Sequence, residues 1–391
     1  MAAASERHCP ACGAHSPRLL ESLSFRVFDS CPVAGCVDLV SCGDCGLGYY
    51  STPSRQADYD RYYAQNGYYA TAQGAGAGGH SAAEVQRFDA RAQLLRRHCR
   101  EANTVMDVGC GRGGLLSRLQ AAGFERAIGV DPNPDCVQLL HDQSQLEAEH
   151  ANAVSFVGRA DLLIYSHVLE HVIDLAPLIQ HAQQQLQDGG YIYVEVPDAA
   201  QYGKGGLLPY HELFLEHVNH FSEDSLHGLF ARHDFRCVAS GQTEVFGHNG
   251  AQLPCLWGIF QRGSSAVPAT DHSLHQALAN YLKNCRAHPM QQHIEQLPKQ
   301  LWLWGVSQHA MLLLGSSALK ERNLLGLLDI DPYKQQQRID GLPISAPQDV
   351  KLNDESVLIT ADAFRTSIAR HLHKLGHRGP LHSLSDGLYQ E

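Results

Sequence analysis

A glycine-rich segment between a predicted strand and a predicted helix constrains the fold of this chain most strongly. It reads Val105-Met106-Asp107-Val108-Gly109-Cys110-Gly111-Arg112-Gly113-Gly114. An apolar strand enters the segment, and its glycines allow the backbone to approach a ligand closely where the next helix begins. The order of strand, glycine turn and helix is typical of the first unit of a Rossmann-like domain.

Predicted strands and helices alternate around this segment. The strands are expected at residues 104–108, 127–130, 162–166 and 191–196, and the helices at 82–99, 114–122, 134–142 and 175–187. Alternation of this kind predicts a parallel sheet with helices on both faces. We therefore predict an α/β fold with a Rossmann-like core.

Two acids beside the glycine turn indicate which cofactor the turn would hold. Gly109, Gly111 and Gly114 also satisfy the dinucleotide pattern GxGxxG, so the glycines alone fit NAD as well. Asp107 suits the ammonium group of a methionine moiety and is poorly placed beside a pyrophosphate. Asp131 ends the second strand, where an acid can accept both ribose hydroxyls of either cofactor. S-adenosylmethionine therefore ranks ahead of NAD, and both rank ahead of a cofactor-free domain.

The N-terminal region carries two CxxC pairs. Their members are Cys9, Cys12, Cys42 and Cys45. Each CxxC turn places two thiolates on one side of a tight loop, and two such turns complete the tetrahedral S₄ geometry of structural zinc. A redox site needs one pair only. Cys31 and Cys36 have a less typical spacing and are expected not to be ligands. We predict a closed Zn²⁺ site without a catalytic role.

The C-terminal region repeats the α/β pattern on a smaller scale. Buried strands are expected near residues 301–305, 324–329 and 356–360, with a helix at 310–320 between the first two. A polar stretch and a predicted helix at 273–296 precede them. We therefore expect a zinc-binding module at 1–60, a methyltransferase-like core at 61–262, a helical linker at 263–300 and a smaller Rossmann-like α/β domain at 301–391.

Composition excludes several partners. The formal net charge is −11, so a nucleic-acid partner is not expected. The first residues lack the apolar run of a signal peptide, and no stretch has the length of a membrane span. We expect a cytoplasmic protein without a membrane partner, in which paired cysteines indicate metal rather than disulfides.

A segment rich in acids, histidines and aromatics follows the fourth strand. It reads Pro209-Tyr210-His211-Glu212-Leu213-Phe214-Leu215-Glu216-His217-Val218-Asn219-His220-Phe221-Ser222. Polar groups among apolar ones are typical of sites where pKa values are shifted for proton transfer. The segment also fits a helix start capped by Ser222, and both interpretations are compatible.

These elements resemble known families. Residues 84–262 are similar to the class I S-adenosylmethionine-dependent methyltransferases, with Asp107, Gly109, Cys110 and Gly111 in their first motif and Asp131 as the ribose acid. The resemblance places His167, after the predicted strand at 162–166, near the sulfonium or the acceptor. It makes Glu170 and His171 structural residues of a helix start.

The whole chain resembles the zinc-containing sugar C-methyltransferases that act on nucleotide-linked 4-keto deoxysugars. The resemblance makes Glu216 and His217 the catalytic pair, with His217 as the base and His220 in support. It also implies an active-site tyrosine between residues 59 and 69. The implied cofactors are S-adenosyl-L-methionine and Zn²⁺, and the implied partner is a small molecule, a nucleotide-linked sugar.

Three departures from that family bear on the substrate. His220 stands where the family has a tyrosine, the glycine-rich segment at 247–252 lacks the following arginine, and Thr360-Ala361-Asp362-Ala363 replaces a Trp-Asn pair. The pattern leaves C-methylation and O-methylation of a sugar or natural-product hydroxyl both open. More remote alternatives are an NAD-linked sugar enzyme and a non-catalytic scaffold. The oligomeric state is not encoded in any of these motifs.

Overall fold

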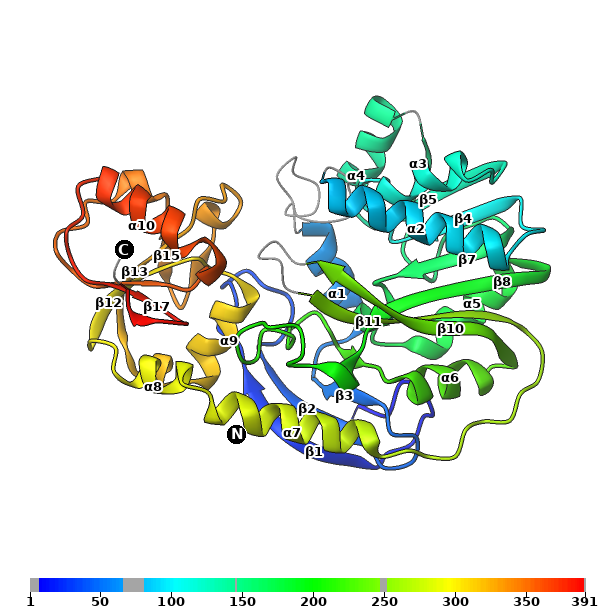
Figure 1. The fold of residues 1–391 in the computed structure, drawn as a ribbon, viewed down its shortest axis with the longest axis horizontal. Coiled ribbons are helices and arrows are strands. Elements are labelled where there is room, and N and C mark those ends of the chain that lie inside the picture. The colour runs from blue at the N-terminus through cyan, green and yellow to red at the C-terminus, as the bar shows by residue number, and fades with distance from the viewer. Residues whose placement is uncertain (1–6, 66–80, 145, 247–251, 390–391) are drawn as a thin grey trace.

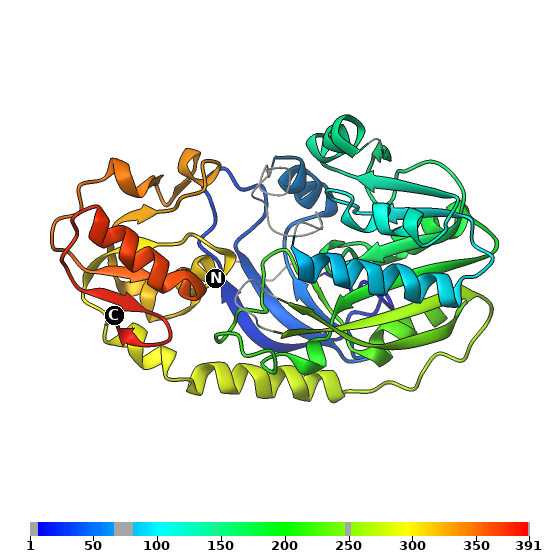
Figure 2. The ribbon, with the colours of Figure 1, turned by 45° about the horizontal axis from the view of Figure 1, so that its top comes forward.

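The computed structural model describes residues 7–65, 81–144, 146–246 and 252–389. Figure 1 shows two lobes, one coloured cyan to green and the other yellow to red. A small blue sheet lies beside the first lobe, and the long helix α7 (Ser273–Ala287) runs along the lower edge toward the second lobe (Figures 1 and 2). Among the described residues, no helix combines the length and apolar character that crossing a bilayer requires.

A seven-stranded sheet forms the larger lobe, in the order β10-β11-β8-β7-β4-β5-β6. Its strands are β4 (Thr104–Val108), β5 (Arg126–Asp131), β6 (Glu147–His150), β7 (Ala160–Ser166), β8 (Leu186–Pro197), β10 (Phe235–Phe246) and β11 (Gln252–Arg262). Five neighbouring strands, in the spatial order β6-β5-β4-β7-β8, pair in parallel. Strand β11 pairs antiparallel with both β8 and β10. The predicted parallel sheet is confirmed, and a β-hairpin extends one edge.

The chain leaves β4 in one direction to β5 and β6 and later returns to place β7 and β8 on the other side. This reversal creates a crevice at the carboxyl ends of β4, β5 and β7, which is where α/β sheets bind ligands. The glycine turn after β4, Asp131 and His167 all lie at this edge, because each one ends or follows one of the three strands.

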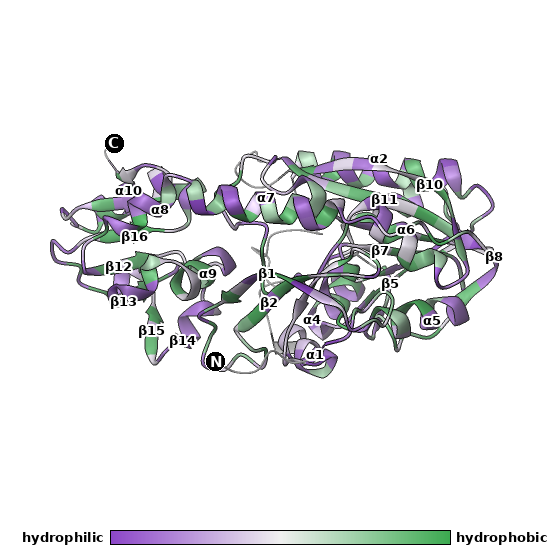
Figure 3. Ribbon diagram, turned by 90° about the horizontal axis from the view of Figure 1, so that it is seen from below, coloured by the Kyte–Doolittle hydropathy of each residue, from purple (hydrophilic) through white to green (hydrophobic). Residues whose placement is uncertain are grey.

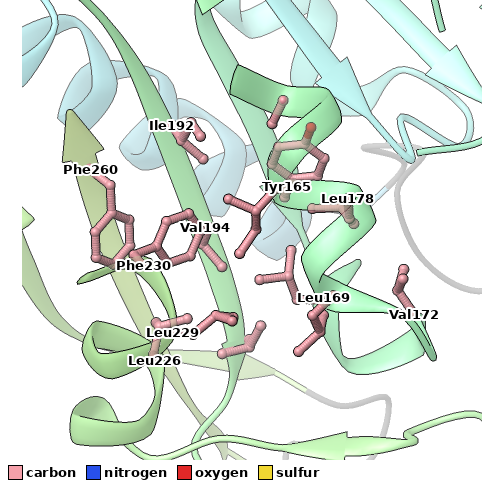
Figure 4. Packing of buried hydrophobic residues seen from close by; sticks show 14 of the residues in the cluster. Tyr165, Leu169, Val172, Leu178, Ile192, Val194, Leu226, Leu229, Phe230 and Phe260 are labelled. Carbon is pink, nitrogen blue, oxygen red and sulfur yellow. The ribbon is translucent and has the colours of Figure 1, made fainter. Parts of the chain in front are cut away.

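Helices cover both faces of this sheet. They are α2 (Ala82–His98), α3 (Gly114–Ala121), α4 (Pro134–Leu139), α5 (Leu175–Gln185) and α6 (Glu223–Ala231). Successive residues of β7 point to opposite faces, so Leu162 packs with the α2 and α3 side while Leu163 packs with the α5 and α6 side. Figure 4 shows the second of these cores, where Phe230 of α6 stacks on Phe260 of β11 at 4.0 Å.

The N-terminal region forms a small antiparallel sheet in the order β1-β2-β3-β9. Its strands are β1 (Pro17–Ser24), β2 (Cys36–Cys42), β3 (Gly48–Ser51) and β9 (Asn219–His220), and helix α1 (Gln56–Gln65) follows β3. Strand β9 comes from the histidine-rich segment, and Gly48 pairs with His220. The cysteine-bearing region is therefore joined by a shared sheet to the segment that contains the predicted catalytic pair.

The smaller lobe holds a second seven-stranded sheet, in the order β14-β15-β13-β12-β16-β17-β18. Its strands are β12 (Gln300–Trp304), β13 (Asn323–Leu328), β14 (Arg338–Ile339), β15 (Leu342–Ser345), β16 (Val357–Ile359), β17 (Leu381–Ser383) and β18 (Gly387–Leu388), with helices α9 (Gln308–Ser316) and α10 (Arg365–Lys374). Strand β12 pairs in parallel with β13 and β16. The predicted small α/β unit has the same central reversal as the larger sheet.

The helix expected at 273–296 is two helices, α7 and α8 (Met290–Glu295). Pro289 explains the break, because the residue before a proline is driven out of the helical region, and His288 is extended at ψ 143°. Five residues of α7 recur at helical spacing and are buried, namely Leu274, Leu278, Tyr281, Leu282 and Cys285. The exposed face carries polar residues, among them Gln276, Asn280 and Lys283, and Figure 3 shows hydrophilic and hydrophobic colours alternating along the helix. Similarly, the helix expected at 134–142 ends at Leu139 and continues as a wider π turn.

Candidate active site

A cavity of about 680 Å³ opens at the carboxyl edge of the larger sheet. It is lined by the glycine turn, by the ends of β5 and β7 and by the histidine-rich segment. Of the predicted site residues, it is lined by Gly109, Gly111, Asp131, His167 and His217. Its volume is in the ordinary range for small-molecule sites. One space thus brings the predicted cofactor residues together with the predicted base.

Glycine is required at the turn for both conformation and space. Gly109 has φ +81°, and a Cβ there would meet Val168 at 2.8 Å. The N–H groups of Gly109 and Cys110 both donate to the carbonyl oxygen of Val130, at 2.7 and 3.1 Å. The turn is therefore tied to β5, and its Gly109 and Gly111 line the cavity without side chains. The Cys110 side chain is buried beneath the turn and does not line the cavity.

Asp131 is fixed by backbone donors on both of its carboxylate oxygens. Oδ2 accepts a 2.8 Å hydrogen bond from the Gly111 N–H, and Oδ1 accepts a 2.9 Å bond from the Asn133 N–H. Burial raises the pKa of Asp131, and these two bonds counteract that rise. Each oxygen keeps a second lone pair, so the carboxylate can still accept hydroxyl donors from the cavity.

Asp107 lies behind the turn, is almost fully buried and does not line the cavity. Burial raises the pKa of its carboxyl to about 7, with Arg91 lowering it and Asp131 raising it further. A carboxyl of this kind changes its charge near neutral pH. An approaching cation would favour the ionised form.

Four charged side chains form a network at one wall of the cavity. Glu195 on β8 accepts a hydrogen bond of 2.9 Å from Arg91 on α2, one of 2.6 Å from the Tyr193 hydroxyl, and contacts His167 at 3.2 Å. The other ring nitrogen of His167 lies 3.1 Å from Glu170. Because buried charges are costly unless paired, the alternation of signs stabilises the network.

The network fixes the charge states of two of its members. Burial alone would raise the pKa of Glu195, but Arg91 and His167 hold it well below its usual value. Burial would lower the pKa of His167, but hydrogen bonds with Cys255 and the two glutamates raise it well above its usual value. His167 also has φ +57°, a rare conformation for a residue other than glycine. It contributes its ring to the cavity, while both of its nitrogens contact glutamates.

His217 lines the cavity as a neutral imidazole. Burial lowers its pKa well below 6.5, and the neighbouring His171 lowers it further. Its ring packs edge-on against His171 at 4.8 Å and against Phe214 at 4.9 Å. A neutral imidazole held by packing can accept a proton from a bound molecule.

The other two predicted catalytic residues lie outside the cavity wall. Glu216 is buried and accepts hydrogen bonds from Tyr62 at 2.8 Å and from Gln308 of the smaller lobe at 2.9 Å. His220 lies in β9, with Nδ1 3.1 Å from the Tyr202 hydroxyl, and burial lowers its pKa to about 3. Through these hydrogen bonds, both side chains hold the segment around His217 in place from outside the cavity.

The tyrosines of α1 occupy different environments. Tyr59 is buried, with its hydroxyl 3.5 Å from the Leu215 carbonyl oxygen, and Tyr62 contacts Glu216. Tyr63 lines the cavity, and its hydroxyl lies 2.9 Å from Nδ1 of His171. Tyr68 and Tyr69 lie outside the described residues, as does the glycine-rich segment at 247–251. Among the described tyrosines of this stretch, Tyr63 best matches the expected active-site tyrosine.

The four predicted zinc ligands converge. The sulfurs of Cys9 and Cys45 lie 3.5 Å apart, those of Cys12 and Cys42 lie 3.6 Å apart, and all four lie within 4.8 Å of one another. A tetrahedral ion with Zn–S bonds of about 2.3 Å requires sulfur–sulfur separations of about 3.7 Å. The cysteine cluster therefore fits a zinc ion.

Sequence reasoning missed several residues of the site. Arg91, Glu195 and Tyr202 were not singled out for chemistry, Glu212 was named only among the acids of the histidine-rich segment, and His171 was assigned a structural role only. Of these, Arg91, Tyr202, Glu212 and His171 line the cavity, and Glu195 anchors the charge network. A signal existed for His171, since it directly follows Glu170 in the turn after β7. No local pattern marks Arg91, which reaches the site from the middle of α2.

Comparison with known proteins identifies the core. Residues 81–240 match a methyltransferase-domain family. The C-methyltransferase NovU of Streptomyces niveus is 26% identical over 195 residues, which cover 48% of this chain and 43% of NovU. A ubiquinone biosynthesis O-methyltransferase of Pseudomonas paraeruginosa is 34% identical over 120 residues, covering 28% of this chain and 48% of that protein. The chain spans less than half the length of these curated relatives.

Solved structures with related folds include a SAM-dependent methyltransferase of Methanosarcina mazei, with 18% identity, a TM-score of 0.38 and coverage of 44% of this chain and 98% of that one. The N-methyltransferase NodS of Bradyrhizobium japonicum, in complex with S-adenosyl-L-homocysteine, has 16% identity, a TM-score of 0.36 and coverage of 47% and 89%. The family match over residues 81–240 confirms the predicted methyltransferase domain.

Proposed function

We propose that this protein transfers a methyl group from S-adenosyl-L-methionine to a carbon atom of a nucleotide-linked keto-deoxysugar, with His217 as general base. The observation that carries the proposal is the shared cavity, in which a neutral histidine faces the same space as the glycine turn and Asp131. NovU, a C-methyltransferase, is similar to this chain over 195 residues.

The cofactor would be held by the turn after β4 and by the two acids. Asp131 offers lone pairs to the ribose hydroxyls, whereas Asp107, which is buried behind the turn and does not line the cavity, would act on the ammonium group of the methionine moiety through its negative charge and not by lining the site. When bound, S-adenosylmethionine supplies an electrophilic methyl group. The protein must then bring an acceptor into line with that group.

His217 creates the nucleophile in this proposal. It removes a proton from the carbon next to the ketone, and hydrogen-bond donors of the cavity stabilise the resulting enolate oxygen. Tyr63 and Tyr202 line the cavity and carry hydroxyl groups suited to such a role. Glu216 and His220 act as positioning residues, because their side chains contact Tyr62, Gln308 and Tyr202 instead of the cavity.

The smaller lobe supports a substrate that reaches beyond the reacting sugar. Ala363 and Phe364 belong to this lobe and line the same cavity. Phe364 is 53% exposed, which is unusual for a phenylalanine and suits stacking against a flat aromatic group such as a nucleobase. We therefore propose that the smaller lobe binds the nucleotide portion of the acceptor.

We further propose that Cys9, Cys12, Cys42 and Cys45 hold a structural zinc ion. Four thiolates leave no open position, so the ion would stabilise the turns that lead into β3 and, through β9, the segment around His217. Metal analysis of the purified protein should give one zinc per chain, and Cys42→Ser should lower both the zinc content and the unfolding temperature.

O-methylation is the second candidate, and the similarity to ubiquinone biosynthesis O-methyltransferases favours it. In that case His217 would deprotonate a hydroxyl in place of a carbon acid. Methyl transfer from ¹³C-labelled cofactor, followed by NMR of the product, distinguishes a C-methyl from an O-methyl group.

The experiment on the base compares wild type with His217→Ala. We expect the variant to retain S-adenosylhomocysteine affinity and to lose methyl transfer by about 100-fold or more. Turnover within a few-fold of wild type would exclude His217 as the base.

A further inference from the structure

Three side chains at the cavity wall could jointly coordinate a cation. Glu170, His171 and His217 each place one potential ligand atom within 4.8 Å of the other two. Glu170 and His171 belong to the short 3₁₀ helix Leu169–His171, whereas His217 approaches from the segment before β9. Two imidazoles and one carboxylate form a mixed nitrogen and oxygen donor set, which is typical of first-row transition metals.

Among the described residues, only one of the two carboxylate oxygens of Glu170 has a hydrogen-bond partner. Glu170 is 1% exposed, and its Oε1 lies 3.1 Å from Nδ1 of His167. Its Oε2 is buried without a hydrogen-bond partner among the described residues. Leaving a buried carboxylate oxygen without a hydrogen bond is unfavourable, because the oxygen loses its contacts with water and gains none in exchange. A cation beside this oxygen would remove that cost.

His171 is oriented as metal-binding histidines are. Its Nδ1 lies 3.1 Å from the backbone carbonyl oxygen of Glu216, and a carbonyl can only accept a hydrogen bond. The Tyr63 hydroxyl lies 2.9 Å from the same Nδ1, so both hydrogen-bond contacts that the described residues make with this ring are at Nδ1, which leaves Nε2 as the nitrogen available to a cation. A ring nitrogen that donates to a backbone carbonyl is the usual second contact of a metal-ligating histidine.

His217 completes the group with a neutral ring held edge-on against His171. Both histidines line the cavity, so a cation bound here would face it. Three protein ligands leave coordination positions for oxygen atoms of a bound molecule or for water. We propose that Glu170, His171 and His217 form a binding site for a divalent first-row transition cation in the wall of the cavity.

The test is a titration of the full-length protein with cobalt(II) alone, followed by visible absorption. The protein is first loaded with zinc so that the cysteine cluster does not take up the cobalt. Its visible absorption distinguishes nitrogen and oxygen ligands from thiolates, because thiolate coordination adds an intense charge-transfer band. We expect one equivalent of Co²⁺ to saturate a spectrum without that band. Glu170→Gln, which is nearly isosteric, and His171→Ala should each weaken Co²⁺ binding by about tenfold or more.

His211→Ala is the matched control, because His211 lines the same cavity but lies outside the three proposed ligands. It should bind Co²⁺ like wild type, and thermal unfolding of each variant verifies that it is folded. Wild-type affinity in Glu170→Gln and His171→Ala, or a Co²⁺ spectrum dominated by thiolate, would overturn the proposal.

One consequence rests on the proposed function. A cation on His217 occupies the lone pair that removes the proton, so saturating Co²⁺ should slow methyl transfer by about tenfold or more in wild type and less in Glu170→Gln. If Co²⁺ binds as expected and transfer is unaffected, His217 fails as the base while the cation site stands. If transfer slows without a bound Co²⁺ signal, the cation site fails.

Discussion

The two parallel sheets of this molecule share a construction but differ at the edge where a ligand would bind. In both, the chain reverses beside the first strand, and an acid at the carboxyl end of the second strand accepts a hydrogen bond from the first loop. Asp131 accepts from the Gly111 N–H at 2.8 Å, and Asp329 accepts from the Val306 N–H at 2.8 Å. The similarity ends with the surroundings of these acids.

Asp131 faces a cavity, whereas Asp329 also accepts from Lys334 at 3.1 Å and is held by its own lobe. The helices after the two loops differ in the same way. Ser307 caps α9 with its side chain, but the N-cap of α3 is Gly113, which has no side chain to offer. The topology of the sheet therefore determines where a ligand can bind, and the side chains of the loop determine whether that position is free or filled by the protein itself.

The largest difference should appear in stability when the charge pairs of the two lobes are broken. Arg91→Met leaves Glu195 buried without its main partner and should lower the free energy of unfolding by about 3–5 kcal/mol. Lys334→Met removes a half-buried partner of Asp329 and should cost about 1 kcal/mol or less. Denaturant unfolding of both variants measures the contrast, and equal losses would contradict it.

The glycines of the two loops give the next largest contrast. Gly109→Ala adds a Cβ 2.8 Å from Val168 at φ +81°, and strain of about 1–3 kcal/mol should be relieved by a shift of the turn away from the cofactor position, which we expect to lower S-adenosylhomocysteine affinity by about five- to a hundredfold. Gly305→Ala is equally crowded, by Ala361, but should destabilise the smaller lobe and leave that affinity unchanged. A loss of affinity in Gly305→Ala would make the second loop part of the cofactor site.

The ionisation of Asp107 should make cofactor affinity depend on pH. Its pKa is about 7, and only the ionised carboxylate attracts the ammonium group, so affinity should fall as pH decreases through 7. We expect S-adenosylhomocysteine to bind about tenfold more weakly at pH 6 than at pH 8. Asp107→Asn should bind weakly and show little of this dependence. An unchanged pH profile in Asp107→Asn would assign the effect to another group, such as Asp131.

The smallest effect should come from Phe364, a residue of the smaller lobe that lines the cavity. Phe364→Ala removes an exposed ring, and loss of stacking worth about 0.5–1.5 kcal/mol corresponds to a rise in acceptor KM of about two- to tenfold. The KM of S-adenosylmethionine should stay unchanged. A rise in the cofactor KM instead would place Phe364 beside the cofactor.

The sequence predicted those parts of the molecule that depend on local pattern. The strand–turn–helix pattern predicted β4, the glycine turn and the position of Asp131 at a strand end. The CxxC spacing predicted that Cys9 and Cys42 lie in one cluster. The break between α7 and α8 was not predicted, although it too has a local cause in Pro289. Such features depend on neighbours within a few residues.

The remaining features depend on contacts between distant segments. Glu216 was expected beside the reacting atoms, but Tyr62 and Gln308 hold it at the junction with the smaller lobe. Arg91 and Glu195 meet across 104 residues of chain, and neither lies in a motif. Residue type and spacing do not reveal which side chains a folded chain brings together at such distances.

The most direct test of the account is calorimetric titration of the purified protein with S-adenosylhomocysteine, for wild type, Asp131→Ala and Asp329→Ala. We predict saturable binding to wild type and to Asp329→Ala, and binding about 100-fold weaker in Asp131→Ala, since two charge-assisted hydrogen bonds are lost. Absence of saturable binding at millimolar ligand, or equal weakening by Asp329→Ala, would contradict it.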